Sequence, residues 1–370
     1  MGRFAALLWH QASHLYSDHP MPSTRFHRLA MAALAGLLAV ACGTSLRAQV
    51  AYDARRARVE VLGLHRWTLA ALQDSIQRRV PGQTLADAAC MVTLRDSLHF
   101  ADALVRDLTY SAAPGAPTRH YLVIKVVEPQ DSARMRWRPA PRDSFTVLRP
   151  SYATVILPVT DSLGHLWIGR FLAPLQLYHR DSALRVALMR ARPDAARADA
   201  DRVWSFLDAH RTESDRRTAL TALRNDGPYA NRVVAAAVLS NFAEQDSTWW
   251  ALADALRDGN DAVRTVAIEV LLSFPSRAVD WAPAVGTLRA LLGGTNVGAT
   301  QELMELLERT RINPTLARPL LHDNGSWVLT HLRAEYPGAS TAAHALLVRL
   351  NGGTDLGTSD VAWSQWIATM

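Results

Sequence analysis

The residues of this 370-residue chain that could perform acid–base or metal chemistry are scattered along it. Nine histidines follow residue 49, and none of them forms an HExxH, an HxH or a Cys/His ligand spacing. The nearest constellation is His322-Asp323 together with His331 and Glu335, and the last two share a face if their segment is helical. A metal site and a solvated helix face are the two interpretations, and the solvated face is favoured. We expect no metal and no cofactor.

Nucleophilic and phosphate-binding motifs give no further candidate. The sequence contains no GxSxG, no GxGxxG and no P-loop. Cys90 lies in a helical pattern with Met91 and Leu94, which favours a small core residue over a reactive thiol. The only other cysteine is Cys42, so a disulfide within the mature chain is not expected. The sequence predicts a protein that is not an enzyme.

The composition is that of an ordinary globular protein, with 49% hydrophobic, 20% charged and 7% aromatic residues. The formal net charge is +6, but residues 1–49 hold four Arg against one Asp, which leaves +3 for the remainder. A charge this small and this interspersed argues against a nucleic-acid partner. At roughly 100–200 residues per domain, the length predicts two domains after a targeting segment.

The targeting segment is predicted within residues 1–49. Arg25, His27 and Arg28 precede an apolar run over residues 29–41, followed by small and polar residues. This is the layout of a secretory signal, and the run is shorter than the roughly 20 residues of a membrane span. Translation would then start at Met21 or Met31. We expect export to the periplasm or cell envelope.

Two cleavage sites compete in this segment. One lies after Ala48 or Gln49. The other lies before Cys42, where Leu38-Ala39-Val40-Ala41-Cys42 resembles a lipoprotein signal and implies lipidation of Cys42 and membrane anchoring. Both alternatives stay open from the sequence.

A small α/β module is predicted over residues 56–130. Val59–Gly63 is typical of a strand, two helical patterns are separated by Pro81-Gly82, and two strands follow at 103–110 and 121–127. With Pro81–Leu85 and Val123–Glu128, this order resembles a POTRA domain, the polypeptide-transport-associated module. The resemblance implies strand edges that receive another chain; a compact cap or spacer is the alternative. Residues 131–179 are predicted as a linker with a β-hairpin formed by 155–159 and 166–169.

Residues 180–352 contain a repeat. Arg232, Ala235, Leu239 and Phe242 recur 32 residues later as Arg264, Ala267, Leu271 and Phe274. Helices are predicted at 182–191, 194–210, 213–225, 229–244, 247–257, 260–273, 280–292, 296–309, 313–322, 326–335 and 339–350. Short antiparallel helices cannot bury their apolar stripes alone, so neighbouring pairs must stack. The predicted class is therefore α+β, mainly α, with an α-solenoid after the α/β module.

The segment Leu252–Ala267 resembles the HEAT-repeat family in its short prokaryotic form, through Asp258 in the turn and Val263-Arg264 at the start of the second helix. The resemblance implies that Arg232 and Arg264 are structural ladder residues that reach a neighbouring unit's turn carboxylate. Residues 353–370, with Trp363 and Trp366 three apart, resemble the tail that closes bacterial arrays of this kind. Capping is favoured there, and partner docking is the alternative.

These patterns favour an exported, non-catalytic scaffold that binds an unidentified protein or peptide on its repeat surface. The alternative is an envelope-associated enzyme or enzyme subunit that uses the repeats to hold substrate. Trp249, Trp250 and Trp281 exceed what a helix stripe requires and are the predicted partner contacts, with burial between helices as the other interpretation. A groove lined by Arg, Trp and aliphatic residues would favour the scaffold, and a convergent cluster of Asp, His or Ser would favour the enzyme.

Overall fold

The structure is a computed structural model that describes residues 49–54, 57–113, 115–139, 141, 152, 155, 157–159, 168–190 and 192–370. Arg47–Met370 form one compact unit. A small sheet near its start is followed by many helices, so the predicted class, α+β and mainly α, is confirmed. The predicted signal, with Met21, Met31 and Cys42, lies outside the described residues.

The sheet has four strands in the order β1-β2-β4-β3. Its outer strands β1 and β3 pair antiparallel with their neighbours, and the central strands β2 and β4 run parallel. The order of the predicted elements agrees, except that the second helix is reduced to α4 and a π-helical turn; β1 was not predicted. The elements are β1 (Gln49–Asp53), β2 (Arg58–Leu62), α3 (Leu69–Arg79), α4 (Cys90–Val92), a π-helical turn (Thr93–Ser97), β3 (Asp102–Tyr110), β4 (Arg119–Val127) and a 3-10 helix (Pro129–Arg134).

Both faces of the sheet are covered. Leu122, Ile124 and Val126 of β4 face a core shared with α3 and the α4 region. Tyr121 and Val123 point to the other side, where they pack with residues of the C-terminal helices. A strand buried on two faces has no polar face to show, which explains why β4 is apolar along most of its length.

Helices predominate in the described residues after the sheet, and every helix predicted between residues 182 and 350 has a counterpart. None of the helices in the described residues combines the length and the apolar character that crossing a membrane requires. The elements are a 3-10 helix (Leu157–Val159), α6 (Ile168–Tyr178), α7 (Ser182–Arg190), α8 (Asp194–Ala209), α9 (Glu213–Asn225), α10 (Tyr229–Val238) with a 3-10 turn (Leu239–Asn241), α11 (Asp246–Ala255), α12 (Asp261–Ser273), α13 (Val285–Leu292) after a 3-10 turn (Ala282–Ala284), α14 (Thr300–Arg309) after a 3-10 turn (Val297–Ala299), α15 (Pro314–Asn324), α16 (Ser326–Leu332), α17 (Pro337–Leu350) and α18 (Asp360–Ala368).

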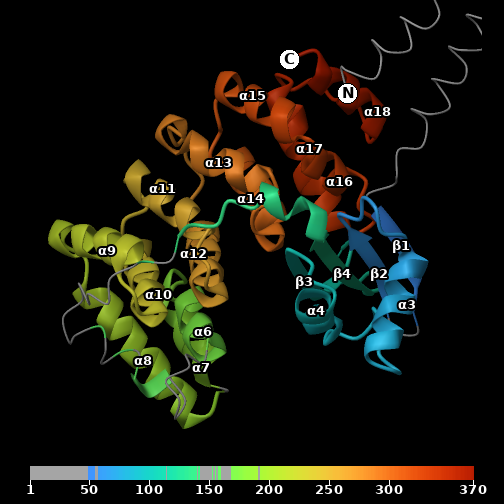
Figure 1. The fold of residues 1–370 in the computed structure, drawn as a ribbon. Coiled ribbons are helices and arrows are strands. Elements are labelled where there is room, and N and C mark those ends of the chain that lie inside the picture. The colour runs from blue at the N-terminus through green and yellow to red at the C-terminus, as the bar shows by residue number, and fades with distance from the viewer. Residues whose placement is uncertain are drawn as a thin grey trace, which may run out of the picture. The chain divides into compact units, whose positions relative to one another are not determined.

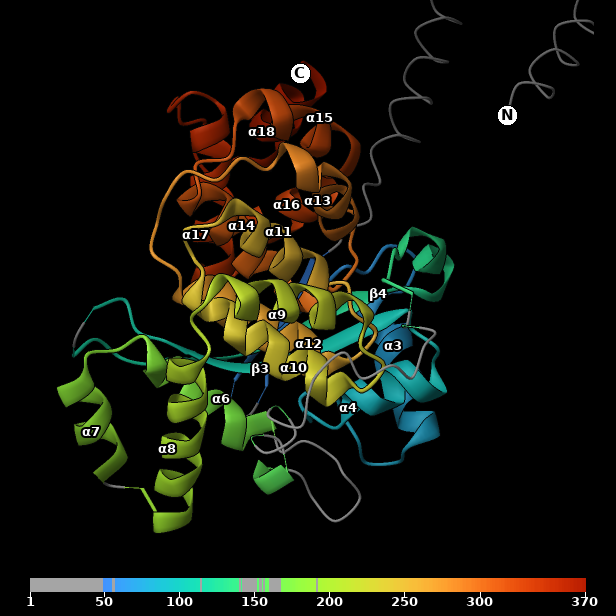
Figure 2. The same ribbon diagram turned by 90° about the vertical axis from the view of Figure 1, so that its left-hand side faces the viewer.

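The central helices stack in two layers (Figure 1). In one layer α9 contacts α11, α11 contacts α13 and α13 contacts α15. In the other, α10 contacts α12, α12 contacts α14 and α14 contacts α17. The sheet lies beside α14, α16 and α17, and Figure 2 shows α9 to α12 side by side in front of it. Each helix pair therefore closes the apolar face of the next.

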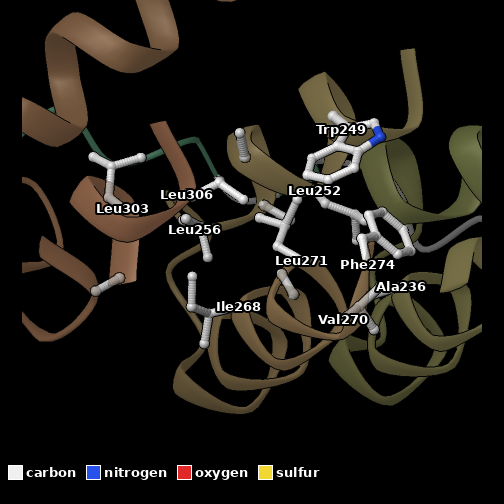
Figure 3. Close-up of a cluster of buried hydrophobic side chains, with 14 of the residues drawn as sticks. Ala236, Trp249, Leu252, Leu256, Ile268, Val270, Leu271, Phe274, Leu303 and Leu306 are labelled. Carbon is white, nitrogen blue, oxygen red and sulfur yellow. The ribbon is translucent and has the colours of Figure 1, made fainter. Parts of the chain in front are cut away.

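The core between the layers runs without interruption from one unit to the next. Figure 3 shows Leu252 of α11 in contact with Leu271 of α12, and Trp249 beside Phe274. Leu303 and Leu306 of α14 continue the same core. The Trp249 and Phe274 ring centroids lie 4.8 Å apart. All of these side chains are buried.

The hairpin predicted from 155–159 and 166–169 was wrong where the structure describes these residues; residues 160–167 lie outside the described part of the chain. Leu157–Val159 form a 3-10 helix, and Ile168 begins helix α6. Pro158 removes a backbone donor from the first predicted strand, which disfavours a sheet position. The second predicted strand ended at Gly169. However, Phe171, Leu175 and Tyr178 follow at helical spacing and are buried, which is the pattern of helix α6. The second helical pattern predicted in the module, after Pro81-Gly82, is also mostly turns: only Cys90–Val92 are α-helical. Residues 86–89 are exposed, so no packed face stabilises a helix there.

Candidate functional site

A groove of about 470 Å³ crosses one layer of the helical row. Three elements supply its walls: the C-terminal half of α9, one face of α11, and the start of α13 with the turn before it. Its lining residues are Leu220, Thr221, Arg224, Asn225, Ser247, Trp250, Ala251, Asp254, Pro283, Ala284 and Thr287. The α11 residues lie at spacings of three and four, so they form one helix face, and that face looks into the groove rather than into the core.

Trp250 is the aromatic surface of this groove. Its ring is partly buried against the edge of the core, and its indole Nε1 donates to the Asp280 carbonyl oxygen at 2.7 Å, which holds the ring in place. The adjacent Trp249 points the opposite way into the core. Adjacent residues of a helix are about 100° apart, so one of two consecutive tryptophans can be structural while the other faces solvent.

The charge of the groove comes from Arg224. Asp254 also lines it, but its carboxylate accepts from the Arg257 Nη1 at 2.9 Å and the Thr287 hydroxyl at 3.2 Å. Within the described part of the chain, no hydrogen bond or ion pair engages the Arg224 guanidinium. In the repeat register Arg224 matches Arg257, but Thr221 stands where the later unit has Asp254. Arg224 therefore lacks the acidic neighbour that its counterpart has.

The structure places the other predicted partner tryptophans elsewhere. Trp281 is buried and donates to the Thr310 hydroxyl at 2.9 Å. Trp363 of α18 is buried and donates to the Gly357 carbonyl at 2.7 Å, with Trp366 half-buried at its edge. Trp249, Trp281 and Trp363 therefore offer no surface to a partner, whereas Trp250 and Trp366 do. The packing of α18 against α15 and α16 is the arrangement expected of a cap.

The predicted ladder contact is present for Arg232. Its guanidinium makes two hydrogen bonds to the Asp258 carboxylate, at 2.8 and 2.9 Å, and reaches the Asp226 carbonyl at 2.8 Å. Both side chains are buried. Burial alone would raise the pKa of Asp258, but the hydrogen bonds from Arg232 and from the Asn260 N–H, together with the nearby Arg138, hold it below its usual value.

Arg264 repeats only half of this arrangement. It donates to the Asp258 carbonyl at 2.6 Å, as Arg232 does to the Asp226 carbonyl. The next unit has no equivalent carboxylate for Arg264 to bind, because Ala290 occupies the position 32 residues after Asp258. Arg264 instead contacts Asp261 and lies over the Trp137 ring, 4.6 Å from its centroid. The ladder prediction was therefore correct for Arg232 and wrong for Arg264. Val263 is buried in the core.

The linker after the sheet module joins this network, which the sequence did not predict. Arg138 contacts the Asp258 carboxylate, and its backbone N–H donates to the Arg257 carbonyl at 2.7 Å. The Arg136 N–H donates to the Thr295 hydroxyl at 2.8 Å, and Arg257 returns a bond to the Arg136 carbonyl. The linker around residues 136–138 thus runs across the turns of successive units. As a result, both Arg138 and Arg232 bind the Asp258 carboxylate.

The other face of the sheet is docked on the C-terminal helices through charged groups. The buried Glu60 carboxylate accepts from the N–H groups of Glu335 and Tyr336, just before α17, at 2.6 and 3.1 Å. Arg58 binds Glu335 through two hydrogen bonds, and Arg106 pairs with Glu302. Carboxylates at a helix N-terminus are favoured by the helix dipole. Glu335 is thus an anchor for the sheet.

Lys125 and His331 lie buried between the sheet and α14 and α16. Burial, the largest cause, lowers the pKa of Lys125 to about 8, opposed by the charge of Glu302. Burial and the charge of Lys125 lower the pKa of His331 to about 3, while its Nδ1 bonds the Trp327 carbonyl at 2.8 Å. The solvated face predicted for His331 and Glu335 was therefore wrong for His331, which is fully buried. Glu335 is exposed and lies after the end of α16, so the two residues do not share a helix face. His322 and Asp323 are exposed on α15, and no group of three or more His, Cys, Asp or Glu in the described residues could hold a metal.

Replacing Lys125 with methionine is expected to flatten the alkaline stability profile. Between pH 8 and about 10.4 the unfolded chain still holds the lysine proton that the folded protein has released, so the free energy of unfolding rises with pH across this window. The rise contributed by Lys125 is about 2–3 kcal/mol and should vanish in Lys125→Met. Urea unfolding at several pH values measures it. An unchanged rise in the variant would contradict this assignment.

Cys90 behaves as predicted for a core residue. It is buried, and its thiol lies 3.7 Å from the Leu85 carbonyl. Burial raises the pKa of the thiol to about 12, which suppresses the reactive thiolate.

No protein-family model, no curated protein and no solved structure matches this chain. Functional inference therefore depends on the residues and their arrangement.

Proposed function

We propose that this protein is an exported, non-catalytic interaction scaffold whose HEAT-like solenoid binds a segment of another protein in the groove over α9, α11 and α13. The observation that carries the proposal is the pairing of a partly exposed Trp250 with an unengaged Arg224 in a groove that crosses three stacked elements. Trp and Arg are among the residue types enriched in the few positions that dominate binding energy at protein interfaces.

The groove chemistry defines the partner. An apolar side chain fits over the Trp250 ring, and an acidic side chain or a chain terminus fits the Arg224 guanidinium. Asn225 supplies a side-chain amide on the wall for backbone hydrogen bonds, whereas the Ser247 and Thr287 hydroxyls already bond Arg216 and Asp254. A short extended peptide carrying one apolar and one acidic residue meets these requirements.

The enzyme alternative needs a different groove. It requires Asp, His or Ser groups that converge on one point. The lining includes one serine and one aspartate, but Ser247 accepts from the Arg216 Nη1 at 2.8 Å and Asp254 is held by Arg257. The scaffold interpretation is therefore the one that the groove favours.

Peptide binding tests the proposal. The full chain is panned against a displayed library of random peptides, and the affinity of the selected peptides is measured by fluorescence anisotropy. Trp250→Ala should weaken binding about 30-fold, because an aromatic hot spot is worth about 2 kcal/mol. Arg224→Glu should weaken binding about tenfold or more, through charge repulsion with the acidic group.

Two substitutions serve as controls. Arg217→Glu makes the same charge change at an exposed site on α9 that does not line the groove. Trp366→Ala removes another partly exposed tryptophan, on α18. Both should leave the affinity unchanged. Selected peptides that bind the Trp250 and Arg224 variants as tightly as the parent protein would refute the groove.

A further inference from the structure

Helix α7 exposes three large apolar side chains, two of them on one side and Val186 on another. Leu184, Val186 and Leu188 are exposed by 44%, 51% and 47%. The other large hydrophobic side chains exposed in the described residues, Val80, Val92 and Val361, lie singly on separate parts of the chain. Only Met189 of α7 is buried. Single exposed apolar residues need no explanation, but a cluster of them on one short helix indicates contact with something else.

The position of α7 leaves this side open. Figure 2 shows the helix at the edge of the ribbon, with α8 beside it. Arg185, on the inner side, lies over the rings of Tyr178 and Trp204 and fastens α7 to the body. Leu184 and Leu188 are four residues apart and so project from the same side, with Ala187 between them.

The charges around α7 are basic. Arg180, Arg190 and Arg192 are exposed, and within the described residues none of their guanidiniums has a hydrogen bond or an ion pair. The single acidic residue of the segment, Asp181, is used by the helix itself, since its carboxylate accepts from the Ala183 N–H at 2.8 Å. An apolar helix side framed by unpaired arginines suits a surface that is apolar inside and anionic at its edge.

We infer that α7 lies on an anionic lipid surface, with Leu184 and Leu188 in the acyl boundary and Arg180, Arg190 and Arg192 at the headgroups. Helices of this composition bind in the plane of the interface, through buried apolar area and attraction to anionic lipids. A self-pairing of α7 is opposed by its own positive charge. A bilayer is also flat, which fits a helix that stands at an edge and exposes Leu184, Ala187 and Leu188 on one side. This inference does not involve the groove.

The test reports on α7 alone. In the full chain carrying Cys42→Ser, an Ala187→Cys substitution is labelled with an environment-sensitive nitrobenzoxadiazole dye, while the buried Cys90 stays unlabelled. Mixed phosphatidylcholine–phosphatidylglycerol vesicles should shift the emission to the blue, and pure phosphatidylcholine vesicles should not. A label at the exposed Glu244 (Glu244→Cys) should not respond to either, which separates docking of α7 from attachment through another part of the chain.

Substitutions complete the test. Leu184→Glu/Leu188→Glu should weaken the response to anionic vesicles at least about tenfold, and Arg190→Glu/Arg192→Glu should weaken it and remove its dependence on salt. Val361→Glu, at an exposed valine on α18, should change nothing. No blue shift at residue 187 with anionic vesicles, or an equal shift with neutral ones, would overturn the inference. A shift produced only by an acidic helical peptide would replace the lipid with a protein partner.

Discussion

Asp258→Asn is expected to lower the free energy of unfolding by about 3 kcal/mol, because it leaves two arginines without their shared carboxylate in a buried site. Arg232 and Arg138 both converge on this group, and the Asp258 side chain is about 2% exposed. Asparagine keeps the shape but removes the charge. Urea unfolding of the two proteins at neutral pH measures the loss.

Asp261→Asn is the matched control. It makes the same change three residues along, at a side chain that is 66% exposed, and should cost less than about 1 kcal/mol. A double variant, Arg232→Met/Asp258→Asn, should lose less than the sum of its single substitutions, since the residues act as one unit. Equal losses for Asp258→Asn and Asp261→Asn would show that the buried network does not stabilise the fold.

Acidification is expected to destabilise the protein through His331. The folded protein keeps this imidazole neutral down to about pH 3, whereas the unfolded chain takes up the proton below about pH 6.5. The unfolded state then binds more protons, so the free energy of unfolding falls as the pH drops through this window, by about 3–5 kcal/mol from this group. His331→Gln removes the titration and should leave a shallower acid limb.

The measurement is the difference between parent and variant in urea unfolding from pH 7 to pH 3, which cancels the carboxylates common to both. His322→Gln, at a side chain that is 56% exposed on α15, is the control and should follow the parent curve. If His331→Gln also follows the parent curve, His331 is not the residue that limits acid stability.

These two predictions concern two different packing interfaces within the protein. Asp258 joins neighbouring repeat units to the linker, and His331 lies where the sheet meets α16. Replacing either residue should lower the stability of the fold but leave the surface residues Trp250 and Leu184 unaltered. Binding in the groove and docking of α7 can thus be assayed separately from stability.

The sequence by itself determined the helical repeat, because helix formation and short turns depend on local spacing. The resemblance to HEAT repeats implied that Arg232 reaches the turn carboxylate of the next unit, and Asp258 is the carboxylate that it binds. The core role of Cys90 followed from its local pattern in the same way. The sequence also contained evidence that Arg224 has no acidic neighbour, which the sequence analysis did not use. Thr221 stands where the later unit has Asp254, the partner of Arg257.

Only the tertiary structure decided which side of a helix stays in water. Trp249 and Trp250 are indistinguishable by type, and their opposite fates depend on where α9 and α12 lie. The same holds for His331, a polar residue that is fully buried, and for Lys125 in an otherwise apolar strand. Contacts between segments 200 or more residues apart, such as Arg58 with Glu335, leave no periodic trace along the chain, because the two partners belong to separate local patterns.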